Sequence, residues 1–417
     1  MKSLLNLSFL ALALAASVRA IQPDELAQRG SDVVEDVLAP IKDGAFNFDD
    51  ALEDTPVDRL TESLDAINLL DDDHPEPTLT IYQLISEHPH TTKFAYHLSQ
   101  HDDLVEILNN TEGRNTLFVP ADEAFDHLPF KEHPPEEWIR SALEYHIATH
   151  VYTAHDLIRT NTMPTVLKEE WLGGKPQRLR ASLTLGGLHI NFLSKVIVPN
   201  TRATNGIIHT INRVAFPPTM VGRELSLLPN HFSTLLLAYE KTDFVKFIHG
   251  VKMEGSTVFA PTNQAFAKLG PRANAFLFNS DKGKVILKAL LKYQIVANVT
   301  LYSDARYGST GEVPIPESGK HYHYDLKTLL QEKHVSVDVN YFGPFVKIKV
   351  NGQTPVVARD VVAKNGVIQV VGRVPLPPHK HHDGENESED EEISVDDLVE
   401  RLSDYIDEED LRYDGEL

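Results

Sequence analysis

Histidines are the residues of this chain whose types and spacing could support chemistry. His97 and His101 stand four residues apart, a spacing that places two imidazoles on one face of a helix, where they can hold a metal ion. His321 and His323 stand two residues apart, which suits one face of a strand. A third group lies near the end of the chain, at His379, His381 and His382. Because the chain is rich in histidine, with 20 in all, we interpret these groups as solvated and predict no metal site and no cofactor.

Two further histidines, His146 and His209, could act as catalytic bases. Each lies in a segment that recurs later in the chain, where Gln294 and Gln369 take their places. Glutamine can form hydrogen bonds but cannot titrate, so this exchange favours a structural contact over proton transfer. The chain has no cysteine, which excludes thiol catalysis, and it has no nucleophile elbow, phosphate-binding loop or dinucleotide fingerprint. We therefore predict a protein that is not an enzyme and has no catalytic or cofactor-binding residues.

An alternative function is a lumenal hydrolytic or metal-dependent enzyme that uses His97, His101 or His146. Active sites assembled from distant residues leave no local motif, so the sequence keeps this alternative open. Metal analysis of the purified protein distinguishes it from an interaction module.

The segments that would position these histidines occur twice. One pair comprises residues 115–125 (NTLFVPADEAF) and 256–266 (STVFAPTNQAF), and the other comprises residues 205–214 (NGIIHTINRV) and 365–374 (NGVIQVVGRV). Two motifs that repeat in the same order at this distance indicate a duplicated domain. The first motif predicts a buried strand that ends at proline and leads into a helix. The second predicts a hairpin turn at Asn-Gly that leads into an apolar strand.

These motifs resemble the two signature blocks of the fasciclin, or fasciclin I-type, domain family. The copy at 256–266 follows the family pattern closely, whereas the earlier copy has Ala121 and Asp122 where the family usually has Thr and Asn. The family's Tyr-His pair is present as Tyr145-His146 and becomes Tyr293-Gln294 in the second copy. The residues that match family motifs, as structural or partner contacts, are Asp122, Tyr145, His146, Asn205, His209, Asn263 and Asn365.

The resemblance implies an α+β fold with two tandem fasciclin-like domains, each a small β-sandwich or wedge with packed helices. We place the domains at residues 76–219 and 222–378. The resemblance also implies adhesion or matrix association through a protein or glycan partner of a cell wall or matrix. In animal members the Tyr-His region is implicated in integrin contact, but we interpret Tyr145-His146 as a buried pair. The chain is similar to fungal proteins with two such domains and no membrane anchor, and we expect it in the secretory pathway, either in a vacuole lumen or at the cell surface.

Several segments outside the repeats carry signals of their own. Residues 1–20 have the apolar run and small-residue cleavage site of a secretory signal, and no later run is long enough to span a membrane. The arms at 21–75 and 379–417 have net charges of −13 and −14, against +3 for residues 76–378, which argues against a nucleic-acid partner. Sequons predict glycosylation at Asn109 and Asn298.

The acidic composition of the two arms predicts that they are mostly disordered, but each arm contains a stripe of apolar residues at helical spacing. We predict that at least one stripe docks on the domains. The stripes are Leu60, Leu64 and Ile67 in the first arm, and Leu398, Leu402, Tyr405 and Ile406 in the second.

Local patterns predict the elements between the motifs. The expected helices span residues 78–85, 94–108, 136–148, 232–239, 244–248 and 284–296, and the expected strands include 179–185 and 188–193. The stretch 307–324 is rich in Gly, Pro and Ser and predicts an exposed loop.

Overall fold

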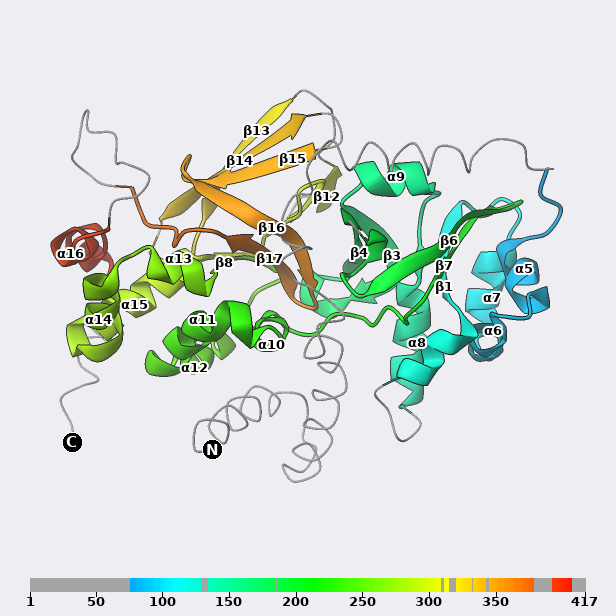
Figure 1. The fold of residues 1–417 in the computed structure, drawn as a ribbon, viewed down its shortest axis with the longest axis horizontal. Helices are drawn as coiled ribbons and strands as arrows, with labels where there is room; N and C mark the ends of the chain where they lie inside the picture. The colour runs from blue at the N-terminus through cyan, green and yellow to red at the C-terminus, as the bar shows by residue number, and fades with distance from the viewer. Residues whose placement is uncertain are drawn as a thin grey trace. The chain divides into compact units, whose positions relative to one another are not determined.

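The computed structural model divides the chain into two compact units, residues 1–219 and 220–417 (Figure 1). We describe each unit separately. The structure describes residues 76–128, 134–184, 186–308, 311–314, 320–331, 333–342, 345–378 and 392–406. Within these ranges, no helix is both long enough and apolar enough to cross a membrane.

The first unit is a seven-stranded barrel in which sequence neighbours pair antiparallel and β7 closes back on β1. Its strands are β1 (Asn115–Pro120), β2 (Ile147–Ala148), β3 (Thr162–Glu169), β4 (Lys175–Thr184), β5 (Gly187–Ile190), β6 (Ser194–Ala203) and β7 (Gly206–Ile211). Its helices are α5 (Ile81–Glu87), α6 (Thr92–Leu98), α7 (Asp102–Asn109), α8 (Glu136–Tyr145) and α9 (Ala154–Arg159), with short 3-10 turns η1 (Asp122–His127) and η2 (Glu170–Leu172).

The second unit repeats this plan with a seven-stranded sheet in the order β13-β14-β15-β16-β17-β8-β9. A single bridge between Val296 and Thr328 joins its two ends. The strands of this sheet are β8 (Ser256–Pro261), β9 (Ile295–Ala297), β13 (His321–Lys327), β14 (His334–Phe342), β15 (Phe345–Val350), β16 (Thr354–Ala363) and β17 (Gly366–Val371).

Helices and a smaller sheet complete the second unit. The helices are α10 (Val221–Ser226), α11 (Pro229–Lys241), α12 (Phe244–His249), α13 (Asn263–Ala267), α14 (Pro271–Asn279), α15 (Asp281–Tyr293) and α16 (Val395–Leu402), followed by η3 (Ser403–Tyr405). Where the first unit has α9, the second has a three-stranded sheet of β10 (Thr300–Leu301), β11 (Ala305–Gly308) and β12 (Gly311–Pro314).

The two repeated motifs lie side by side in each unit. The first motif forms β1 or β8, the second forms β7 or β17, and the two strands pair in parallel. In the register of these pairs, Phe118 lies opposite His209 and Phe259 lies opposite Gln369. The signature blocks are therefore the two halves of one strand pair.

β1 is buried on both faces, as its unbroken apolar run predicts. Leu117 and Val119 face the cluster formed with helices α5, α6 and α7, while Phe118 faces the interior of the barrel with Met163 and Leu179. Alternate side chains of a strand point to opposite faces, so this single strand joins both cores.

Gly206 and Gly366 begin the second strand of each pair, at φ +154°. A Cβ atom would lie 1.9 Å from the carbonyl oxygen of Asn115 at Gly206, and 2.1 Å from that of Ser256 at Gly366. The glycine of each Asn-Gly motif therefore serves the close approach of the parallel strand, while Asn205 lies in the turn itself.

The α+β class with two tandem domains is confirmed, with several local corrections. The first unit closes into a barrel and is not a sandwich or wedge, because β7 pairs with β1. The helix predicted at 94–108 is two helices, α6 and α7, separated by a break at residues 99–101. The helices predicted at 136–148 and 284–296 end at Tyr145 and Tyr293, and the chain continues as β2 and β9.

The loop predicted at 307–324 is also wrong for the residues that the structure describes, because they form the end of β11, the strand β12 and the start of β13. The predicted exposure is confirmed for several of them, including His321 and His323, whereas Tyr307 is buried. Gly and Pro content misled the prediction because β-hairpins use the same residues in their turns.

The acidic C-terminal stripe docks on the second unit, as predicted. α16 packs against α14 and α15 (Figure 1), and Leu398 and Leu402 are completely buried. After the helix, the ring of Tyr405 lies 4.4 Å from the Lys333 ammonium group. Ser394 caps the helix by accepting a hydrogen bond from the Asp397 N–H. The N-terminal stripe lies outside the described residues.

We expect Leu398→Ala to release α16 while the rest of the domain stays folded, because burial of this side chain contributes about 2 kcal/mol or more. Amide exchange at residues 395–402 of the full chain should then become at least about thirtyfold faster. Apolar burial is not screened by ions, so protection in the unsubstituted protein should change little between low and high salt. Asp396→Ala, at an exposed position of the same helix, is the control, and unprotected exchange at 395–402 in the unsubstituted protein would contradict docking.

Candidate functional sites: buried motif residues and a histidine cluster

His209 is fully buried in β7 and stacks on Phe118, with 5.4 Å between ring centroids. Its Nδ1 accepts a hydrogen bond from the backbone N–H of Asn200 at 3.3 Å. Its Nε2 lies 2.8 Å from the carbonyl oxygen of Tyr152, to which it donates. Burial lowers the pKa of His209 to about 4, so the ring is neutral at physiological pH and both of its nitrogens are occupied.

Gln369 makes the same two contacts in the second domain. Its Oε1 accepts from the backbone N–H of Asp360 at 3.1 Å, and its Nε2 donates to the carbonyl oxygen of Leu301 at 3.0 Å. A carboxamide can replace a neutral imidazole here because each offers one donor and one acceptor at similar reach.

Asn200 and Asp360 bind the backbone at an irregular part of each domain, and the sequence analysis did not identify them. Both adopt a left-handed backbone, at φ +58° and +59°, next to a bulge in β6 or β16. Their side chains accept backbone N–H groups from the connection that follows the second strand of each domain, from Ala154 at 2.8 Å and Ser303 at 2.7 Å. An Asn and an Asp five residues before each Asn-Gly motif were the available signal, since both residue types tolerate this conformation.

Tyr145 and His146 are buried within the first domain. The Tyr145 hydroxyl donates to the carbonyl oxygen of Arg178 at 2.9 Å and accepts from Asn191 Nδ2 at 2.7 Å. His146 Nδ1 donates to the carbonyl oxygen of Ala142 at 2.6 Å, and its Nε2 accepts from the Ala215 N–H at 3.0 Å. Burial lowers the pKa of His146 to about 4. Neither side chain is accessible to a partner in this conformation.

The second copy of this pair changes in a concerted way. Tyr293 keeps both contacts, donating to the carbonyl oxygen of His334 at 3.2 Å and accepting from Asn351 Nδ2 at 2.9 Å. Pro375 stands where the first domain has Ala215 and has no N–H to offer. In the second domain, Gln294 therefore replaces His146, and Pro375 replaces the residue whose N–H group donates to that histidine.

Asn205 and Asn365 connect each hairpin to the first described helix of its domain. Asn205 Oδ1 accepts from the N–H of Ile81, the first residue of α5, at 2.9 Å. Asn365 Oδ1 accepts from the N–H of Val221, the first residue of α10, at 3.0 Å. Each amide therefore satisfies a helix N-terminus that has no partner within the helix.

Asp122 and Asn263 bond to helices other than their own. The Asp122 carboxylate accepts from the Thr92 hydroxyl and the Lys93 N–H at the start of α6, both at 2.8 Å. Asn263 Oδ1 accepts from the Thr234 N–H, and its Nδ2 donates to the carbonyl oxygen of Asn230, both at 2.8 Å in α11. Asn263 is the first residue of α13, but Thr262 provides the side-chain cap of that helix.

The candidate metal pair of the first domain, His97 and His101, is not on one helix. His97 lies in α6 with its ring stacked on Phe125, whereas His101 is the N-cap residue of α7. His101 is nearly buried, with its Nε2 3.2 Å from a carboxylate oxygen of Glu136. The break between α6 and α7 removes the helical spacing that would let His97 and His101 share a metal ion, which was one form of the enzyme alternative.

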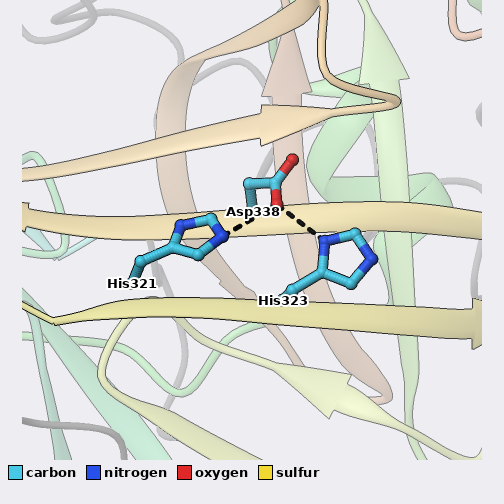
Figure 2. A group of neighbouring side chains, drawn as sticks. All are labelled: His321, His323 and Asp338. Carbon is cyan, nitrogen blue, oxygen red and sulfur yellow. Dashed lines mark hydrogen bonds and ion pairs between the residues drawn. The ribbon is translucent and has the colours of Figure 1, made fainter.

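Within the described part of the chain, one group of three metal-ligating residues is close enough to share an ion: His321, His323 and Asp338. The histidines lie on β13 and the aspartate on β14, and their ligand atoms all lie within 4.8 Å of one another (Figure 2). Sequence reasoning found both histidines but not Asp338, because the pairing of β13 with β14 brings in a residue 15 positions beyond His323.

Both sequon asparagines that we selected are exposed. Asn109 is the last residue of α7, and its Oδ1 accepts from the Thr80 hydroxyl at 2.6 Å. Asn298 lies between β9 and β10, and its Oδ1 accepts from the Glu254 N–H at 2.9 Å. Glycosylation at these positions stays a prediction.

We expect Asn263→Ala to destabilise the second domain, and Asp122→Ala the first, by about 1–2 kcal/mol each, because each substitution removes two hydrogen bonds that tie the side chain to a neighbouring helix. Both tryptophans, Trp138 and Trp171, belong to the first domain, so their fluorescence during urea unfolding reports that domain. Asp122→Ala should shift this signal, whereas Asn263→Ala should leave it unchanged and lower a calorimetric transition of the whole chain. Gln264→Ala, at an exposed neighbour, is the control, and an unchanged calorimetric profile for Asn263→Ala would contradict the role.

We also expect the first domain to lose stability as pH falls from about 6.5 to about 4. His146 and His209 have folded-state pKa values of about 4, below the unfolded value of 6.5, so the stability linked to their neutral forms is complete above pH 6.5. The loss is on the order of 3 kcal/mol per histidine. Tryptophan-monitored unfolding at a series of pH values measures it.

The variant carrying His146→Gln and His209→Gln is the matched test, because glutamine occupies both positions in the second domain. Its stability should depend much less on pH over the same interval. An equal pH dependence in variant and unsubstituted protein would show that other groups control acid unfolding.

The family comparison identifies both repeats. The model of the fasciclin domain matches residues 89–217 and 230–377, so the resemblance of the repeated motifs to this family is confirmed. A solved FAS1 domain pair from the insect cell adhesion molecule fasciclin I aligns at a TM-score of 0.32 and 19% identity, over 68% of this chain and 96% of that chain.

Relatives occur in fungi and animals. The chain is 29% identical over 365 residues to the aurofusarin biosynthesis cluster protein S of Gibberella zeae, covering 80% of this chain and 88% of that protein. It is 26% identical over 230 residues to stabilin-2 of Rattus norvegicus, covering 52% of this chain but only 15% of that protein. It is 29% identical over 269 residues to the transforming growth factor-beta-induced protein ig-h3 of Oryctolagus cuniculus, covering 64% of this chain and 33% of that protein. The chain thus spans a third or less of these two animal relatives. Because the two matched segments comprise more than half of its residues, this chain belongs to the fasciclin domain family.

Proposed function

We propose that this chain is a non-enzymatic interaction protein of the secretory pathway, located in a vacuole lumen or at the cell surface, whose two fasciclin domains bind a protein or glycan partner. Fasciclin domains are typically adhesion and matrix-interaction modules, which supports this assignment. The expected secretory signal at residues 1–20 and the exposed sequon asparagines support the location.

The main support for the proposal is that the buried histidines His146 and His209 use their ring nitrogens in hydrogen bonds to the backbone. A general base must reach the proton that it removes and must titrate near the working pH. His146 and His209 are buried, have pKa values of about 4 and use both ring nitrogens in hydrogen bonds with the backbone. Gln369 reproduces the contacts of His209 without being able to titrate. These contacts favour a structural role over the enzyme alternative.

One exposed aliphatic position recurs in both domains and supports a protein partner. Ile197 and Val198 on β6 are 47% and 49% exposed, and Val357, at the position in β16 equivalent to Ile197, is 38% exposed. All three lie where a bulge shifts the register of the strand against its neighbour. Bulges redirect side chains, and single exposed aliphatic side chains are ordinary, but their recurrence at one position of both copies favours a binding surface.

A binding assay with isolated cell-wall or matrix material from the producing cells tests the proposal. The mature full-length chain should bind saturably, and treatment of the material with protease should remove binding if the partner is a protein. Ile197→Ser with Val198→Ser, combined with Val357→Ser, should reduce the bound fraction severalfold, because about 25 cal/mol is lost per Å² of apolar contact.

The control is the variant with His146→Gln and His209→Gln, which should bind as the unsubstituted protein does. Protease-resistant binding that is lost on glycosidase treatment would indicate a glycan partner. Absence of saturable binding, together with a hydrolytic activity that the histidine substitutions abolish, would overturn the proposal in favour of an enzyme.

A further inference from the structure

The outer face of the hairpin β13–β14 carries polar side chains from both strands. Alternation along β13 directs Tyr322 and Tyr324 to the opposite face from His321 and His323. The antiparallel register places His323 opposite Asp338 and His321 opposite Asn340. The two histidines and the aspartate therefore share one face of a hairpin at the edge of the sheet.

The distances within this group suit a shared cation. Asp338 Oδ1 lies 2.7 Å from His323 Nδ1 and 3.4 Å from His321 Nε2 (Figure 2). Bonds of ~2.0–2.1 Å to a tetrahedral zinc ion place its ligand atoms about 3.3 Å apart. The pair of His321 and Asp338 already has this separation, and the pair of His323 and Asp338 reaches it by opening about 0.6 Å, within reach of a small side-chain rotation.

We propose that His321, His323 and Asp338 form a binding site for Zn²⁺ or a related divalent transition-metal ion, with a fourth position open to water or to a ligand from another molecule. Two imidazoles and one carboxylate are a known ligand set of four-coordinate zinc sites that keep the fourth position for water or another ligand. Mg²⁺ and Ca²⁺ prefer oxygen ligands throughout, so this site selects against them.

Neighbouring groups orient the ligands. His321 Nδ1 lies 2.7 Å from Asn340 Oδ1, and a hydrogen bond from that nitrogen leaves Nε2 free to bind a metal on the side of Asp338. Asp325 lies 3.5 Å from His323 Nε2 and adds negative charge to the same face. The side chains of His321 and His323 are 56% and 49% exposed, so an ion can enter directly from solvent.

Two features weaken the site relative to a buried structural zinc site. In the register of β14 with β15, Lys349 lies opposite Asp338 and Lys347 lies opposite Asn340, so two lysine side chains share the face of the sheet that carries the site. The hydrogen bond between His323 and Asp338 must also open before both side chains can bind one ion. Binding should therefore be reversible.

Zinc titration of the mature full-length chain with a chromophoric indicator tests the site, with Mg²⁺ in excess throughout. The informative variants are His321→Ala combined with His323→Ala, and Asp338→Asn, which keeps the shape of the side chain. Loss of one ligand should lower zinc affinity at least about tenfold, because even the loss of a residue that only hydrogen-bonds to a metal ligand costs about this much. Removal of both histidines should abolish one equivalent of binding.

Other histidines could bind zinc, so two control variants are needed. His381→Ala with His382→Ala removes most of the tail tract, and His88→Ala with His90→Ala removes an exposed pair of the first domain. Neither should affect the equivalent assigned to β13–β14. The proposal is supported if that equivalent disappears only with His321 and His323 and weakens with Asp338→Asn.

It is overturned if the variant lacking His321 and His323 binds as many zinc ions with unchanged affinity, or if Asp338→Asn has no effect. Circular dichroism and thermal unfolding should be unchanged in all of these variants, because the substituted side chains are exposed or replaced by one of the same shape. This test is independent of the partner-binding assay, since zinc binding requires no partner.

Discussion

The parallel pairing of β1 with β7, and of β8 with β17, is the contact on which the rest of each domain depends. It joins two strands that lie about 90 or 110 residues apart in the chain and that are buried on both faces. Parallel pairs cannot be made by a short turn, so the intervening helices and strands must fold around them. The approach is so close that only glycine fits at positions 206 and 366. Because β1 contributes to the helical cluster and to the barrel interior, an error in this register would disturb both cores.

Buried polar side chains fix the irregular parts of the backbone around this pair. The bulges in β6 and β16 leave backbone N–H groups without a partner in the sheet, and His209 and Gln369 accept from two of them. A buried donor without a partner would cost about 1–3 kcal/mol, so each contact has a clear physical reason. The agreement between the copies extends to Thr116 and Thr257, whose hydroxyls each accept one backbone N–H and donate to one carbonyl at 2.8 Å.

With the interior so constrained, the two domains differ mainly in what they add to it. The first places a helix, α9, after the second strand, whereas the second places the sheet β10–β12 there. The second domain also carries the polar face of β13–β14 and the docked helix α16. An interaction protein can diversify in this way, because a fixed scaffold positions surface elements that are free to vary.

The sequence alone determined the features that arise from local pattern and repetition. The doubled blocks predicted two domains and the family, continuous apolar runs predicted strands buried on both faces, and the spacing of Leu398 and Leu402 predicted a helix that docks. Histidine-to-glutamine exchange between the copies favoured structural contacts over catalysis. The tertiary structure alone decided which distant groups meet. Strand register brought Asp338 to His321 and His323, a helix break separated His97 from His101, and the packing of α13 beside α11 placed Asn263 against the α11 backbone. Composition cannot supply register, because a shift of one residue moves every side chain of a strand to the opposite face, and only the packed core excludes the alternatives.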